Sequence, residues 1–223
     1  QDYDQTLPFG VKYASPPAGP NTNWGFLLLE ILGEGNGENQ GIDDLGNASS
    51  IFKCPEGITT QQNNDFGMHY SAHPRLMPAI NETDAKTGML FQSRTVDSVD
   101  NASDIMLFGD GVQIENSSAP GTWGAASQAY QLNGFGLNDT SAAKNFLVRG
   151  PGVIYDESID AGTNEDAVNF SDNAGNLRFR HFNAEPGGPG SANIGFLDGH
   201  SATVNYRSQN DTDLLKQNVY LTR

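Results

Sequence analysis

The chain has few of the residues on which several common protein classes depend. Its 223 residues include a single cysteine, Cys54, and only 12 Lys and Arg against 27 Asp and Glu. One cysteine cannot form a disulfide within the chain, which excludes a disulfide-stabilised framework. A formal net charge of −15 argues against nucleic acid or an anionic membrane surface as partner, because both need basic side chains to neutralise phosphate.

Long apolar runs and familiar catalytic motifs are also missing. The longest apolar runs, such as Phe26–Leu29, are far shorter than the roughly 20 residues of a membrane-spanning helix. There is no Gly-x-Ser-x-Gly, no dinucleotide-binding glycine motif, no phosphate-binding loop and no His-Glu-x-x-His. His69 and His73 are four residues apart, but Pro74 and the alternation of apolar residues favour a strand over a helical zinc site. These absences favour a non-enzymatic protein.

Glycine and proline are abundant instead, with 26 Gly and 11 Pro, so much of the chain must form loops. A chain of this length can bury one sizeable core, and we expect a single domain over residues 1–223. Apolar residues at helical spacing predict a helix over Trp24–Leu32, and Ile51–Cys54 is predicted to be a short strand or turn. Glu115–Ala174 shows little periodicity and is predicted to be a loop-rich insertion. Alternating residues predict strands at Asp65–Ala72, Met89–Phe91, Asp104–Phe108, Leu177–His181, Asn193–Leu197 and His200–Tyr206.

Two of the predicted strands run into the dipeptide Asp-Gly. Asp198-Gly199 lies between two β-rich runs, which predicts a hairpin with a type I′ turn and positive φ at both residues. Asp110-Gly111 repeats the pattern, so two such hairpins side by side would form the centre of an antiparallel sheet. Both aspartates are then expected to bond their own backbone. Arg178 and Arg180 are expected to pair with acids, and Arg180 or His181 would lock the hairpin by contacting Asp198.

Several segments resemble, in the same order, those of prepilin-like proteins with an "H-X9-DG" signature. Ile51–Pro55 is similar to "F-K-C-P", Asn101–Gly111 to "N-P-S-E-T-I-L-F-A-D-G", and His181 with Asp198-Gly199 to the signature itself. Sixteen residues, 182 to 197, separate His181 from Asp198, where the name of the signature implies nine. The surplus falls in the glycine-rich loop Glu185–Ser191. Gln1–Pro8 and Trp24–Leu32 also resemble segments of this family.

The resemblance implies an α+β fold: a pilin-like head with an antiparallel β-sheet, few short helices and long loops. It implies a structural subunit of an extracellular pilus-like filament or type II secretion-like pseudopilus, assembled from its own copies or with other pilin-like subunits. The head would face the periplasm or the cell exterior, and membrane contact would come only through an N-terminal helix missing from this sequence. The residues that match structural motifs are Cys54, Pro55, Asp110, Gly111, His181, Asp198 and Gly199. Cys54 would be a buried thiol, or would pair with a cysteine in the missing helix.

Two further interpretations concern the predicted insertion. Acidic residues there make calcium a candidate cofactor, because hard cations prefer clustered oxygen ligands on loops, and the major pseudopilin of type II secretion holds calcium in a loop. The candidate ligands are Asp156, Asp160 and Asp166. The alternative function is a surface-displayed module that binds glycans or another polymer. In that module aromatic side chains would stack on sugars, the candidates being Trp123, Tyr130, Phe135 and Tyr155.

Overall fold

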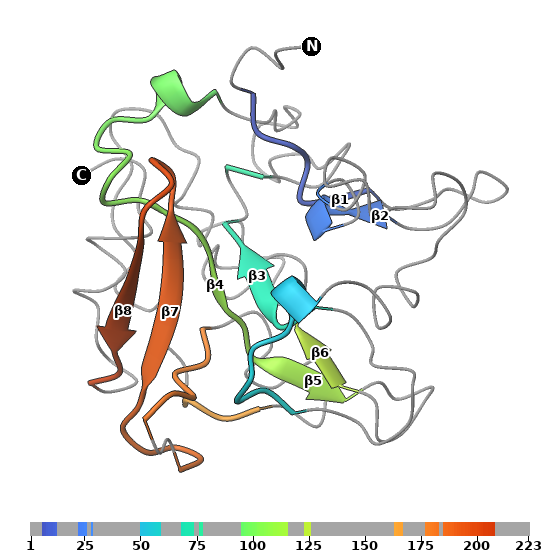
Figure 1. Cartoon of the computed structure of the whole chain (residues 1–223), viewed down its shortest axis with the longest axis vertical. Helices are drawn as coiled ribbons and strands as arrows, with labels where there is room; N and C mark the ends of the chain where they lie inside the picture. The colour runs from blue at the N-terminus through green and yellow to red at the C-terminus, as the bar shows by residue number, and fades with distance from the viewer. Residues whose placement is uncertain are drawn as a thin grey trace, which may run out of the picture.

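A four-stranded antiparallel sheet is the main element of the computed structural model (Figure 1). Its strands are β3 (Tyr70–Ala72), β4 (Met106–Asp110), β7 (Ser191–Phe196) and β8 (Ser201–Asn205), in the order β3-β4-β7-β8. The two strands that run into Asp-Gly are therefore direct neighbours, as predicted. The structure describes residues 6–12, 22–25, 28, 50–58, 68–73, 76–77, 95–115, 123–125, 163–166, 177–182 and 185–207.

Two smaller antiparallel pairs accompany this sheet. β1 (Val11–Lys12) pairs with β2 (Thr22–Asn23), and β5 (Gln113–Glu115) pairs with β6 (Trp123–Ala125). Short 3₁₀ helices form at η2 (Ser50–Phe52) and η3 (Val96–Ser98).

The described part of the chain is thus rich in sheet. The antiparallel sheet of the predicted α+β fold is confirmed, whereas helix is scarce in this part. Within the predicted helix Trp24–Leu32, the described residues Trp24, Gly25 and Leu28 are helical. In the described ranges, no helix is long and apolar enough to cross a membrane. The predicted strand Met89–Phe91 lies outside those ranges.

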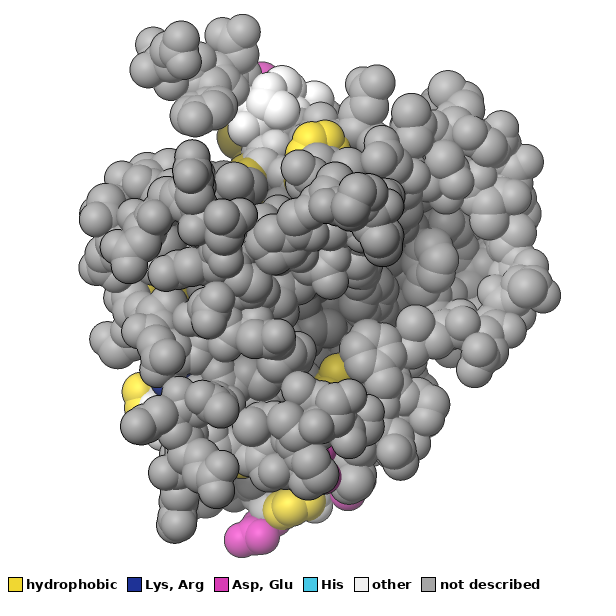
Figure 2. Space-filling model, turned by 90° about the vertical axis from the view of Figure 1, so that its right-hand side faces the viewer, with side chains coloured by type: hydrophobic (Ala, Val, Ile, Leu, Met, Phe, Trp, Pro, Cys, Tyr) yellow, Lys and Arg dark blue, Asp and Glu magenta, His cyan; other side chains and the backbone are white. Residues whose placement is uncertain are grey.

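A hydrophobic core joins the N-terminal part of the chain to one end of the sheet. The Trp24 ring packs edge-on against Phe52, with centroids 6.0 Å apart, and stacks on Phe108 at 5.9 Å. Each large apolar side chain that is fully buried contributes about 1.5–3 kcal/mol to folding. The buried members of this core are Trp24, Phe52, Met68, Ala72, Leu76, Met77, Val99, Ile105 and Leu197. On the face shown in Figure 2, described hydrophobic side chains emerge only as small separate areas.

The β7–β8 hairpin is confirmed, but the predicted type I′ turn is wrong. The Gly199 N–H donates to the Phe196 carbonyl at 3.0 Å and the Phe196 N–H donates to the His200 carbonyl at 2.8 Å, which leaves a three-residue loop. Gly199 has φ +93°, whereas Asp198 has no positive φ. This arrangement is typical of a turn followed by one left-handed residue. The cause is Leu197, which is buried and donates its N–H to the Ile105 carbonyl at 2.9 Å.

The second predicted hairpin, at Asp110-Gly111, does not form. Asp110 is the last residue of β4, and Gly111 makes an isolated bridge with Leu177 before the chain continues into β5. The Asp110 carboxylate does not bond its own backbone but accepts the N–H of Asn193, on the neighbouring strand β7, at 2.7 Å. A long-range contact therefore replaces the local turn that the dipeptide predicts.

Gly199→Val is expected to lower the free energy of unfolding by about 1–3 kcal/mol, because a β-branched residue is strained at positive φ. A Cβ at this position would meet no atom within 4 Å, so the cost comes from the backbone alone. Urea unfolding would measure it. Gly199→Asn is the matched control, since asparagine tolerates the left-handed region and should lose much less. Equal losses for the two variants would contradict the assigned turn.

Candidate functional site

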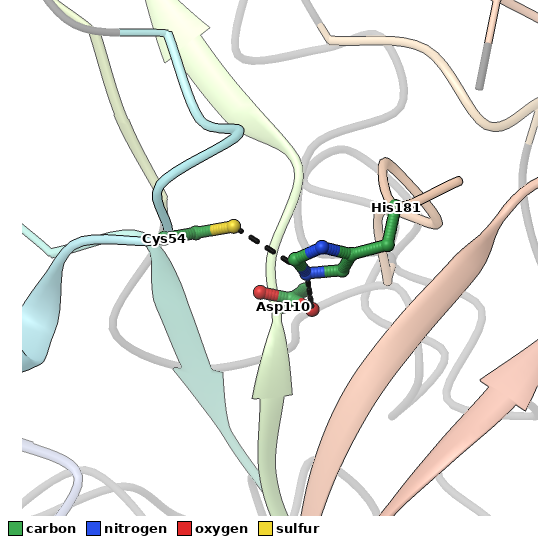
Figure 3. Close-up of side chains that lie close together, drawn as sticks. All are labelled: Cys54, Asp110 and His181. Carbon is green, nitrogen blue, oxygen red and sulfur yellow. Dashed lines mark hydrogen bonds and ion pairs between the residues drawn. The ribbon is translucent and has the colours of Figure 1, made fainter. Parts of the chain in front are cut away.

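Three residues from distant parts of the chain meet in one cluster: Cys54, Asp110 and His181 (Figure 3). The thiol sulfur, a carboxylate oxygen and an imidazole nitrogen all lie within 4.8 Å of one another. Cys54 Sγ is 3.5 Å from His181 Nε2, and the same nitrogen is 3.1 Å from Asp110 Oδ2. Each residue lies in a different one of the segments that resemble prepilin-like proteins. These segments are far apart in the sequence, and the fold brings them together.

The turn Cys54–Gly57 holds the thiol. The Gly57 N–H donates to the Cys54 carbonyl at 2.9 Å, and Pro55 occupies the second turn position, where its fixed φ is favourable. The Cys54 N–H donates to Nδ1 of the fully buried His69 at 2.9 Å. A Cβ on Gly57 would overlap the His69 ring, so glycine is required for this close approach. His69 thus supports the turn.

Asp110 is a fully buried carboxylate at the end of β4. Its Oδ2 accepts the Asn193 N–H at 2.7 Å and faces His181, while Oδ1 has no hydrogen-bond partner among the described residues. Burial raises the pKa of Asp110, although the Asn193 N–H and the nearby His181 and Arg180 oppose that rise. The energetic cost of burying the Asp110 carboxylate is therefore only partly offset by these neighbours.

His181 lies on a segment that crosses from the end of β4 to the start of β7. His181 and Ser191 exchange backbone hydrogen bonds of 2.9 and 3.1 Å, and the Arg178 N–H donates to the Asp110 carbonyl at 2.9 Å. The predicted strand Leu177–His181 is therefore wrong: the segment is held by single bridges at its two ends. On the imidazole, Nδ1 is 3.4 Å from Glu56 Oε1, and Nε2 is 2.9 Å from Asn193 Nδ2.

The cluster does not activate its thiol. Burial, followed by the charge of Asp110, raises the pKa of Cys54 to about 11. Only about one thiol in ten thousand would then be ionised at pH 7, whereas reactive cysteines have lowered pKa values and some exposure. Burial and the same carboxylate raise the pKa of Tyr70 to about 12. The environment of the cluster therefore favours the neutral thiol of Cys54 and the neutral phenol of Tyr70.

Arg178 and Arg180 pair with an acid, as predicted, and the acid is Asp166. Arg178 Nε lies 3.2 Å from Asp166 Oδ2, and Arg180 Nη2 lies 3.3 Å from Oδ1. The Gln113 N–H also donates to Asp166 Oδ1, at 2.9 Å. Both carboxylate oxygens face guanidinium groups, which makes Asp166 a poor ligand for calcium. The other two candidate ligands, Asp156 and Asp160, lie outside the described residues.

Asn164, which no sequence pattern indicated, is buried beside this ion-pair network and has φ +58°. Its Oδ1 accepts the Phe179 N–H and Arg178 Nη1–H, both at 2.7 Å. Its Nδ2 donates to the carbonyls of Phe179 at 3.2 Å and Gly188 at 2.8 Å. The Asn164 side chain thus makes the two backbone hydrogen bonds to Phe179 that a neighbouring strand would otherwise make, and so supports the segment that carries His181. An asparagine in a polar loop gives no sequence signal for this role.

The remaining predicted residues lie elsewhere. Asp198 does not lock the hairpin through Arg180 or His181. Its Oδ1 accepts the His200 N–H at 3.1 Å and lies 2.6 Å from His200 Nδ1, and these contacts lower the pKa of Asp198. Asp198 therefore binds its own turn, as predicted. Trp123 lies on β6 and is partly buried, whereas Tyr130, Phe135 and Tyr155 lie outside the described ranges.

Comparison of the chain with protein-family models, curated proteins and solved structures finds no match. Function must therefore be inferred from the chain's own residues and their arrangement.

Gly57→Ala is expected to destabilise the fold by about 1–3 kcal/mol, because the added methyl group would overlap the His69 ring beside the Cys54 turn. Thermal unfolding followed by circular dichroism would measure the loss. Asp198→Asn in the exposed β7–β8 turn is a suitable control, since asparagine also fits that position. A Gly57→Ala protein that melts like the wild type would contradict the packing of His69 against this turn.

Asp166→Asn should cost about 3–5 kcal/mol, because it leaves two buried arginines without their counter-charge. Chemical unfolding is the direct measurement. Glu185→Gln also removes one negative charge but from an exposed side chain, and a change within about 0.5 kcal/mol is expected there. If both variants lose equally little, the ion-pair network does not support the fold as described.

Proposed function

We propose that this chain is the head of a pilin-like or pseudopilin-like subunit that acts by assembling into an extracellular filament. The observation that carries the proposal is the convergence of Cys54, Asp110 and His181. Each comes from a different segment of the ordered prepilin-like resemblance, and the folded chain brings them together, with Cys54 and Asp110 buried and His181 partly buried. Motif residues of a structural head are expected to hold distant segments together, and these three do so.

The chemistry of the cluster supports a structural role over catalysis. Cys54 is only 1% exposed and its pKa is raised, so it is a poor nucleophile. His181 is the best candidate for acid–base chemistry, but its ring nitrogens are surrounded by Glu56, Asp110 and Asn193. A general base must reach the proton of a substrate, whereas Nε2 of His181 already lies within hydrogen-bonding distance of Asp110 and Asn193.

On this proposal, the partners are further copies of the chain or other pilin-like subunits. An N-terminal helix preceding the head would anchor the precursor in the inner membrane and later pack in the filament core. The head would face the exterior, where a net charge of −15 favours solubility. Neither nucleic acid nor an anionic membrane surface is expected to bind the head.

The test is to express the complete gene in its own host and label the head with an antibody in electron micrographs of cell envelopes. Labelled filaments or short pseudopili are expected, together with high-molecular-weight material in envelope fractions. A variant with a disrupted prepilin-peptidase site upstream of Gln1 is the control and should give no filaments. Detection of the wild-type protein only as a free monomer would contradict the proposal.

A further inference from the structure

The Cys54–Asp110–His181 cluster combines a sulfur, an oxygen and a nitrogen donor around one point (Figure 3). Asp110 Oδ1 is buried and without a hydrogen-bond partner among the described residues, and it lies on the Cys54 side of the carboxylate. A buried polar atom without a partner costs about 1–3 kcal/mol, so an unpaired oxygen on a carboxylate beside the thiol and the imidazole points to a ligand. We propose that Cys54, Asp110 and His181 bind one divalent transition-metal ion of the zinc type.

The two donor separations that involve His181 fit such an ion. With Zn–S near 2.3 Å and Zn–N near 2.0 Å, a tetrahedral angle separates sulfur from nitrogen by about 3.5 Å, and nitrogen from oxygen by about 3.3 Å. The structure has 3.5 Å between Cys54 Sγ and His181 Nε2, and 3.1 Å between that nitrogen and Asp110 Oδ2. Three protein ligands leave a fourth position for water or another donor, as in many open zinc sites.

The surroundings of His181 also fit metal binding. A ligating histidine commonly donates its other ring N–H to a carboxylate, which fixes the tautomer and orients the ring. Glu56 Oε1 is 3.4 Å from Nδ1 and can accept that proton, which leaves the Nε2 lone pair directed into the cluster. Asn193 Nδ2 now lies 2.9 Å from Nε2. Asn193 is on the exposed side of β7, so its side chain can turn aside when an ion enters, at the expense of the 2.9 Å hydrogen bond that its Oδ1 accepts from Thr203.

The donor set selects the class of ion. Calcium prefers oxygen ligands only, whereas thiolate and imidazole favour zinc and related ions. A coordinating thiol is deprotonated outright by the metal, so the thiolate and the Asp110 carboxylate together neutralise a divalent charge. The bound ion would cross-link the turn Cys54–Gly57, the end of β4 and the segment that carries His181. This inference does not depend on the proposed filament function.

Cobalt titration of the full chain, after reduction and removal of metals with a chelator, provides the test. Co²⁺ bound to a thiolate gives a ligand-to-metal charge-transfer band in the near ultraviolet. Because Cys54 is the single cysteine of the chain, that band reports on this site alone. We expect the band to saturate at one equivalent, to disappear on adding Zn²⁺, and the melting temperature to rise with either ion.

Variants separate the proposed site from surface binding. Cys54→Ser should abolish the band, and His181→Ala or Asp110→Asn should weaken affinity by more than the roughly 10- to 100-fold that a lost outer-shell partner costs. Glu56→Gln, whose side chain is half exposed and should not disturb folding, is expected to weaken Zn²⁺ binding about tenfold. His200→Ala removes an exposed histidine that also has a carboxylate neighbour, and it should leave affinity unchanged.

Two results would overturn the inference. One is a folded wild-type chain that binds no Co²⁺ or binds it without a charge-transfer band, because the Cys54 thiolate would then take no part in binding. The other is an unchanged affinity in folded His181→Ala and Asp110→Asn variants. If those two variants fail to fold, the Glu56→Gln titration and the wild-type band still decide the question.

Discussion

The burial of the Asp110 carboxylate is the constraint on which the arrangement around β4 depends. A buried charge is costly unless it is paired or hydrogen-bonded. Asp110 gains a backbone N–H from Asn193 in β7 and faces the imidazole of His181, and Arg180 lies close enough to lower its pKa. Its backbone carbonyl also accepts the Arg178 N–H. One residue at the end of a strand thus fixes the neighbouring strand and the crossing segment 177–181.

The crossing segment is in turn held from its other side by a second polar network. Arg180 donates to the Gly111 carbonyl at 2.7 Å and to Gln113 Oε1 at 2.8 Å, and its ion pair with Asp166 brings part of the predicted insertion against the sheet. Asn164 completes the backbone hydrogen bonding of Phe179. Residues 163–166 therefore belong to the structural framework, although most of Glu115–Ala174 lies outside the described residues.

Local signals in the sequence predicted the four strands of the main sheet, and long-range contacts decided the site. Alternation predicted the β7–β8 hairpin, since a hairpin depends on residues near each other in the chain. The dipeptide Asp110-Gly111 gave the same local signal but ends a central strand, because partners distant in sequence bind its carboxylate. Cys54 and His181 were singled out through the resemblance, but their meeting at Asp110 could not be read from spacing. Asn164 and Asn193 gave no signal at all.

The contact that His181 makes also explains how a long loop fits between it and Asp198. His181 binds Asp110 of β4 and pairs its backbone with Ser191, so no direct contact with Asp198 has to be maintained. The backbone pairing of His181 with Ser191 joins the two ends of the loop of residues 182–190. Lengthening such a loop is inexpensive, since each doubling costs only about 0.6 kcal/mol in closure entropy. The separation of the histidine from the Asp-Gly turn can therefore vary while the histidine keeps its place beside β4.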